Sequence, residues 1–225
     1  MVLQTGDADF AQFHAISTAV EDSLPPMLEL LRKIDPTFRE IPHEADSRRA
    51  TAYVTRSGYR VEFLTPNTGS ADNDGHPADM PALGGASATP LRFLDFLIHE
   101  PVRGVLLHKS GVPVLVPAPS RYAVHKLIVA SRRRKDDDGT AKQRKDLRQA
   151  AELAEALAHV RQADDLADAV HEAFERGPHW QAALLAGLKM MPETDGDPCR
   201  QVVRDGFNLL AEELQASPPG PEPHP

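Results

Sequence analysis

The sequence predicts an α+β fold in which strands come first and helices follow. Two hairpin-like pairs of segments flank glycine-containing turns, 50–56 with 59–64 and 102–107 with 112–116. From Pro119 onward, apolar residues instead recur at the three- and four-residue spacing of helices. We therefore expect a small β-sheet followed by a helical C-terminal half.

Composition sets broad limits on the class of protein. With 225 residues the chain is long enough for one domain or two small ones, and its formal net charge is −8. That charge argues against general binding of nucleic acid or anionic membranes, although a local basic patch remains compatible with it. A single cysteine, Cys199, excludes a disulfide framework and is typical of a reducing cytosol.

Neither a membrane segment nor a targeting segment is evident in the sequence. No apolar run approaches the roughly 18 residues that a membrane helix needs. The N-terminus also lacks the basic-then-apolar pattern of a signal peptide. We expect a cytoplasmic protein that has no contact with a membrane.

Taken in order, the chain alternates predicted elements with turns. Strands are expected at residues 1–13, 50–56, 59–64, 102–107 and 112–116. Helices are expected at about residues 21–34, 90–98, 120–135, 141–158, 163–175, 179–190 and 199–214. Residues 38–43 are predicted to be irregular, and the glycine- and proline-rich residues 65–89 to form a long loop.

Three parts of the chain are expected from this order. Residues 1–118 are predicted to form an α/β domain and residues 119–216 a helical domain. The proline-rich residues 217–225 are predicted to be a disordered tail.

The first predicted strand carries two acids, Asp7 and Asp9. Residues two apart in a strand point to the same face, so these carboxylates lie close together and repel unless a cation or proton lies between them. Hard oxygen ligands of this kind suit Mg²⁺ alongside the phosphates of a substrate. An ordinary surface pair remains the alternative, because the same acidic spacing recurs at 44/46, 72/74, 136/138, 193/195 and 195/197.

A third acid, Glu62, lies in the predicted strand 59–64, on the face it shares with Arg60 and Leu64. Either it faces water and pairs with an arginine such as Arg60, or it joins Asp7 and Asp9 in one site. Three carboxylates from two strands are what phosphoryl and nucleotidyl transfer need. Two divalent ions clamp the attacking and leaving oxygens, and the third acid can accept the proton of the attacking hydroxyl.

Basic residues of the predicted helices are candidates for binding phosphate. Lys126 and Lys145 are predicted to contact the oxygens of a nucleoside triphosphate as point charges, and Arg121 is predicted to bind the nucleotide with them. For the basic run at 132–135, a solvated helix C-terminus is the favoured interpretation, because positive charge suits that end of the helix dipole.

Several other classes of site are excluded by their missing motifs. Ten histidines are present, but none has the His-x-x-x-His or His-Glu-x-x-His spacing of a zinc site. The glycine-containing motifs of serine hydrolases, dinucleotide-binding proteins and P-loop proteins are absent from the sequence.

Five blocks of sequence together resemble a known family: residues 7–12, 59–66, 90–97, 116–127 and 142–150. They are similar to bacterial nucleotidyltransferase-fold proteins, distant relatives of polymerase-beta-type transferases, over roughly residues 4–158. The resemblance implies a mixed sheet, the palm, with helices on one side. It also implies that Asp7 and Asp9 are the metal pair and Glu62 the third acid.

The activity that the resemblance implies is transfer of a nucleoside monophosphate from an NTP, with Mg²⁺ or Mn²⁺ as the cofactor. The acceptor hydroxyl belongs to an unknown protein, RNA or small molecule.

One feature departs from this family. Its members carry a Gly-Ser or Gly-Gly element about ten residues before the acidic pair, where a helix N-terminus cradles the triphosphate. Only six residues precede Asp7, and Thr5-Gly6 is too close to be that element. We therefore expect an N-terminally incomplete palm with an unpaired sheet edge. Either the true start lies upstream of Met1, or the chain is a shortened form with impaired catalysis.

Two further functions compete with the transferase. One is a non-catalytic module that uses the same fold to bind a partner, of the defence or toxin–antitoxin type. The other is an RNA-binding protein that uses residues 132–148, which the overall acidity disfavours.

Overall fold

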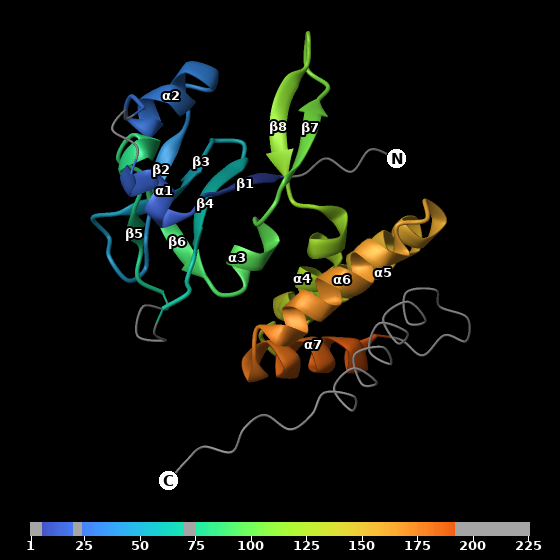
Figure 1. The fold of residues 1–225 in the computed structure, drawn as a ribbon. Helices are drawn as coiled ribbons and strands as arrows, with labels where there is room; N and C mark the ends of the chain where they lie inside the picture. Colours follow the sequence, from blue (N-terminus) through green and yellow to red (C-terminus); the bar gives the residue numbers. More distant parts are fainter. Residues whose placement is uncertain (1–5, 20–23, 70–74, 192–225) are drawn as a thin grey trace. The chain divides into compact units, whose positions relative to one another are not determined.

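The computed structural model describes residues 6–19, 24–69 and 75–191 (Figure 1). The chain divides into two compact units, Met1–His99 and Glu100–Pro225. The second hairpin, which the sequence analysis places in the first domain, belongs to the second unit with the helices. The predicted α+β fold with a helical C-terminal half is confirmed.

The first unit is built on a mixed sheet. Its strands are β1 (Asp7–Ala11), β2 (Arg39–Pro42), β3 (Ala50–Val54), β4 (Arg60–Pro66), β5 (Ala78–Asp79) and β6 (Ser87–Leu91). The order is β2-β3-β4-β6-β5, and β1 pairs with β4 outside this path. Both β1 and β6 run parallel to β4, whereas the β2–β3, β3–β4 and β5–β6 pairs are antiparallel.

One face of this sheet holds the core of the unit. Along β4, Val61 and Phe63 are buried, whereas Arg60 is exposed and Glu62 is half-buried. The buried side chains pack with Met27 and Leu31 of helix α2 (Met27–Ile34) and with other apolar residues, namely Phe38, Tyr53, Met80, Ala86 and Ala88. Because side chains alternate along a strand, the face that carries Arg60 and Glu62 is the one turned away from this core.

Two predictions about irregular segments are wrong. Residues 39–42 form β2 rather than an irregular stretch, and the predicted loop 65–89 contains β5 and most of β6. These strands are short, and β6 includes Pro90, which argues against a strand when the sequence is considered alone. Pairing with β4 and the complete burial of Ala88 stabilise β6. The remaining helices of this unit are α1 (His14–Ala19), η2 (Pro81–Leu83) and α3 (Leu94–Leu97).

The second unit combines a hairpin with helices. Its elements are β7 (Val102–Leu106), β8 (Val112–Val116), α4 (Pro119–Ser131), α5 (Asp137–His159), α6 (Ala163–Glu175) and α7 (Pro178–Met190). Helix α4 contacts α5, α6 and α7, and its Val124 and Ile128 side chains are fully buried. Gly187 lets α7 approach α4, because a β-carbon there would overlap the carbonyl oxygen of Leu127. The predicted helix 199–214 and tail 217–225 lie outside the described residues.

Candidate functional site

Strand β4 lies inside the sheet over its first residues. Arg60 and Glu62 each pair with β3 and also with β1, so these two strands lie on opposite edges of β4. Backbone bonds extend the β1 ladder, since the Arg60 amide donates to the Gly6 carbonyl at 2.9 Å and the Gln12 amide donates to the Leu64 carbonyl at 3.1 Å. Glu62 therefore belongs to an interior strand. Among the described residues, β1 pairs with β4 alone.

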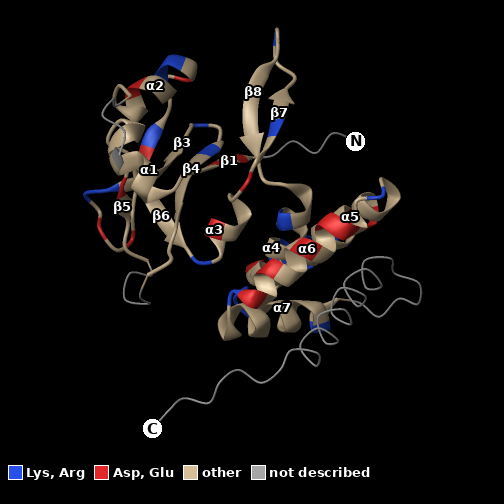
Figure 2. Cartoon of the chain, viewed as in Figure 1, with Lys and Arg blue, Asp and Glu red and all other residues tan. Residues whose placement is uncertain are grey.

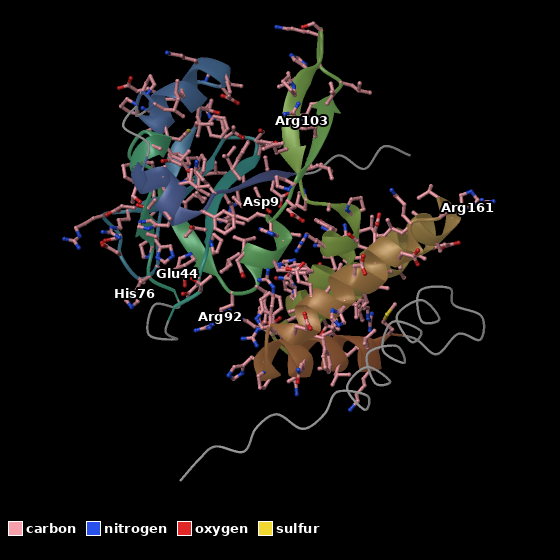
Figure 3. All side chains as sticks on the ribbon, in the orientation of Figure 1. Asp9, Glu44, His76, Arg92, Arg103 and Arg161 are labelled. Carbon is pink, nitrogen blue, oxygen red and sulfur yellow. The ribbon has the colours of Figure 1, made fainter. Side chains whose placement is uncertain are left out.

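The register of β1 and β4 brings the three predicted acids onto one face. Asp9 is the Cα partner of Glu62, and Asp7 is the Cα partner of Arg60. Paired residues of neighbouring strands point to the same side of a sheet, so Asp7, Asp9 and Glu62 share a face. Asp7 and Asp9 are exposed there, and Figure 3 labels Asp9 on β1.

The opposite face of these strands is aromatic. Phe10 of β1 stacks on Phe63 of β4 with ring centroids 5.8 Å apart, and Tyr53 meets Phe63 edge-on at 5.9 Å. A slip of one residue between β1 and β4 would turn Asp7 and Asp9 toward these rings. The aromatic packing thus holds the register that places the acids on the open face.

A cation of the chain already lies among the acids. The Arg60 Nη2 atom is 2.6 Å from Glu62 Oε1, and both side chains are partly exposed. Of the two alternatives for Glu62, the pair with Arg60 is present, and Glu62 also shares a face with Asp7 and Asp9, whereas its membership of one site with them stays a prediction. No group of three or more His, Cys, Asp or Glu side chains in the described part of the chain is arranged to hold a metal ion.

A hollow of about 370 Å³ opens in the first unit beside Arg60. Its lining includes Ile41, Ala52, Arg60 and Thr89. By register, Ala52 is the partner of Glu62, Ile41 is the partner of Ala52, and Thr89 is the partner of Leu64. These positions therefore share the face of the sheet that carries the acids, so the face offers both carboxylates and a concave surface.

The predicted phosphate ligand Arg121 lies in the second unit, where its largely buried guanidinium forms ion pairs with two more exposed carboxylates. Its Nη2 atom is 2.7 Å from Glu172 Oε2 and 3.5 Å from Glu100 Oε2. Burial raises the pKa of the Glu172 carboxyl, but hydrogen bonds from Arg121 and Arg176 outweigh burial and hold it below its usual value. Arg121 thus ties the start of α4 to α6.

The predicted ligand Lys126 is also engaged within the second unit. Lys126 Nζ donates to Asp146 Oδ1 at 2.9 Å, and Arg133 Nε donates to Asp146 Oδ2 at 2.8 Å. The Asp146 side chain is only 2% exposed, so both of its oxygens are satisfied by cations. This cluster joins α4 to α5 across their interface.

The third predicted ligand, Lys145, is exposed on α5, next to Asp146 in sequence. Of the basic run at 132–135, Arg132, Arg134 and Lys135 are exposed beyond the end of α4, whereas Arg133 turns inward to Asp146. Figure 2 shows how the charged residues are distributed along these helices. The structure thus brings Lys126 and Arg133 together and leaves Lys145 on the surface.

His125 titrates unusually because of this environment. Burial lowers the pKa of its imidazole from 6.5 to about 4, with a further contribution from the charge of Lys126. The unfolded chain takes up the proton near pH 6.5 and the folded chain only near pH 4. Stability is therefore complete above pH 6.5 and falls between pH 6.5 and 4, by about 3 kcal/mol.

This pH dependence is a testable prediction. Urea unfolding followed by the fluorescence of Trp180, the only tryptophan, should lose this pH slope in His125→Gln. The matched variant His179→Gln, at an exposed histidine of α7, should keep it. Equal slopes in His125→Gln and the parent chain would contradict the assignment.

Asp146 is the residue that the sequence analysis missed. A signal was present, because Asp146 precedes Ala150 and Ala154 by one and two helical turns on the buried face of α5. A carboxylate on a buried helical stripe indicates a partner cation, and here it has two.

Asp7, Asp9 and Glu62 come from two adjacent strands and share the open face of a sheet whose other face is packed, although in the described residues they do not converge on a metal-binding arrangement. A sequence model of the family described as nucleotidyltransferase matches residues 1–175. The chain belongs to this nucleotidyltransferase family, which assigns it to nucleotidyl transfer in general.

Comparisons with curated proteins and with solved structures gave no match. None of the described helices has the length and apolar character required to cross a bilayer.

Proposed function

We propose that the chain transfers a nucleoside monophosphate from an NTP to an acceptor hydroxyl, with Asp7, Asp9 and Glu62 as the metal-binding and catalytic groups. The register that pairs Asp9 with Glu62 and places Asp7 on the same face is the observation that carries this proposal. Membership of the nucleotidyltransferase family supports it.

The donor set on this face suits a divalent cation. All three side chains offer hard carboxylate oxygens, the ligands that Mg²⁺ and Mn²⁺ prefer. The Arg60 guanidinium, 2.6 Å from Glu62, already balances part of this negative charge, so a bound cation would have to compete with it for Glu62. Asp7, Asp9 and Glu62 would hold the ion. When bound, it supplies charge neutralisation at the phosphoryl oxygens.

The chemical step transfers one phosphoryl centre. The acceptor oxygen forms a bond to the α-phosphorus, the bond from that phosphorus to the bridging oxygen breaks, and pyrophosphate leaves. Glu62, on the interior strand, takes the proton from the acceptor hydroxyl, which makes the oxygen a better nucleophile. Asp7 and Asp9 would hold the cation beside the triphosphate.

Arg60 has a second role in this proposal. The Arg60 guanidinium pairs with Glu62 and Arg60 also lines the hollow, so this side chain would be available to a substrate phosphate if a cation took its place on Glu62. An arginine fork matches the geometry of phosphate oxygens, so Arg60 positions the triphosphate while the nucleoside occupies the hollow. No step of this mechanism depends on the predicted contacts of triphosphate with Arg121, Lys126 and Lys145, which stay predictions.

We place this reaction in the cytoplasm, where Mg²⁺-bound NTPs are available and where a chain with one cysteine is typical.

Nucleotide binding tests the proposal without knowledge of the acceptor. Each of the four NTPs is added with Mg²⁺ or with EDTA, and the unfolding temperature of the full chain is measured. At least one NTP should raise it by about 5 °C when present at roughly 100 times its Kd, and only with the metal. Asp9→Asn should lose this rise, because the metal loses an anionic ligand.

A matched control separates loss of the site from general damage. Glu29→Gln removes an exposed carboxylate from α2, on the packed side of the sheet, and should keep the full NTP-dependent rise. A parent chain that ignores all four NTPs, yet purifies with another protein stably bound, would favour the partner-binding module instead.

A further inference from the structure

The hairpin β7–β8 exposes apolar side chains on both faces, with one charged residue, Arg103, on one of them. Val102, Gly104 and Leu106 pair with Val116, Val114 and Val112, so one face carries these six residues and no charge. The other face carries Arg103, Val105, Pro113 and Leu115. Exposure is high for such side chains, at 62% for Val105, 57% for Leu106 and 66% for Leu115.

A two-stranded ribbon of this kind is at best marginally stable in water, and a third strand or a packed partner is normally needed. In the described part of the chain, β7 and β8 form a sheet of two strands only. The hairpin is therefore an interaction surface that lacks a partner within the chain as described.

The two edges of this ribbon differ. Pro113 of β8 has no N–H to donate, so Pro113 and Val105 form a non-hydrogen-bonded pair of the ladder. The backbone groups of both residues therefore point outward, away from the partner strand. By alternation, the pair of Arg103 with Leu115 is of the same kind. The outer edge of β8 thus carries Pro113, which blocks strand addition, whereas the outer edge of β7 presents the backbone groups of Arg103 and Val105.

We propose that β7 pairs antiparallel with β7 of a second copy of this chain, which makes a four-stranded sheet across a two-fold axis at Gly104. In this register, Arg103 of one copy lies opposite Val105 of the other, and each of these two pairs exchanges both of its backbone hydrogen bonds. Two arginines are then not directly opposed, so no like charges face each other. Figure 3 labels Arg103 on the hairpin.

A second copy fits this edge for two reasons. The edge is self-complementary about Gly104, as a two-fold interface requires, and two-fold dimers are the commonest assemblies. The uncharged face also becomes continuous, because Val102 of one copy lies beside Leu106 of the other.

Two edge prolines test the proposal in the full chain. Val105→Pro removes an outward N–H from β7, and by symmetry it acts twice in the dimer. Sedimentation should show a dimer of the parent chain at about 100 μM and at least ~10-fold weaker association for Val105→Pro. Leu115→Pro removes the matching outward N–H from β8 and should dimerise as the parent does.

Hydrogen exchange of the parent chain provides a second measurement that needs no variant. The amides of Arg103 and Val105 should gain protection as protein concentration rises, whereas the Leu115 amide should exchange rapidly throughout. A parent chain that is monomeric at about 100 μM overturns the proposal, whether or not another protein binds the hairpin. So does a dimer in which Val105 stays unprotected, or one that the two prolines weaken equally.

Discussion

Replacement of Asp146 with alanine is expected to destabilise the helical unit by about 3–5 kcal/mol, because two cations lose their common carboxylate. Lys126 lies 2.9 Å and Arg133 2.8 Å from the Asp146 oxygens, and Asp146 is 2% exposed. In Asp146→Ala, Lys126 keeps a largely buried charge without its partner. Chemical unfolding followed by the fluorescence of Trp180 in α7 measures the loss in this unit.

A matched ion pair on the same helix provides the control. Asp138 and Lys142 are 2.6 Å apart, but both side chains are more than half exposed. Exposed pairs contribute little, so Asp138→Ala should cost no more than about 0.5 kcal/mol. Similar losses for Asp138→Ala and Asp146→Ala would show that burial is not the cause.

The same cluster allows a second test. If the penalty in Asp146→Ala comes from uncompensated charge, removal of the cations as well should relieve it. The triple variant Lys126→Met, Arg133→Met, Asp146→Leu replaces the cluster with apolar side chains, and it should recover most of the lost stability. A triple variant as unstable as Asp146→Ala would instead point to lost packing.

Replacement of Glu62 with glutamine is expected to slow nucleotidyl transfer at least ~100-fold, the lower end of what a general base contributes. The amide keeps the size of the carboxylate but cannot accept the proton, and it is a weaker metal ligand. Pyrophosphate release from the NTP, with an acceptor supplied by cell extract, measures the rate without identification of the acceptor.

Folding is expected to be nearly unchanged in Glu62→Gln. The ion pair with Arg60 is partly exposed, so its loss costs little. Glu40→Gln removes an exposed carboxylate from β2 of the same sheet and should keep full activity. Full pyrophosphate release by Glu62→Gln would remove Glu62 from the mechanism, whatever happens to NTP binding.

Elements with a strong local pattern were predictable. The strands β3, β4, β7 and β8 have alternating or apolar runs around glycine turns, and α4 to α7 have helical spacing with few breaks. Strands β2 and β5 were missed because they are short, and β6 was missed because it contains Pro90. Their stability depends on pairing with strands elsewhere in the sheet, which a local pattern does not contain.

The candidate site was also predictable only in part, because its geometry depends on the pairing of strands that are distant in the sequence. Asp7, Asp9 and Glu62 were identified from residue types and spacing, since carboxylates in apolar strands are unusual. That they share a face depends on the parallel register of β1 and β4, two strands separated by more than 45 residues. Aromatic packing of Phe10 on Phe63 contributes to this register, and no sequence motif encodes that contact.

The sequence, through its local patterns and its resemblance to a known family, was therefore enough to predict the α+β class and the nucleotidyltransferase family, and to single out Asp7 and Asp9 as candidates. The tertiary structure decided the partners: Asp9 beside Glu62, Lys126 with Asp146, and, in the described part of the chain, β7 with β8 alone. The reason is physical. Spacing along the chain sets which face of an element a side chain occupies, whereas its charge acquires a partner only when distant segments pack together.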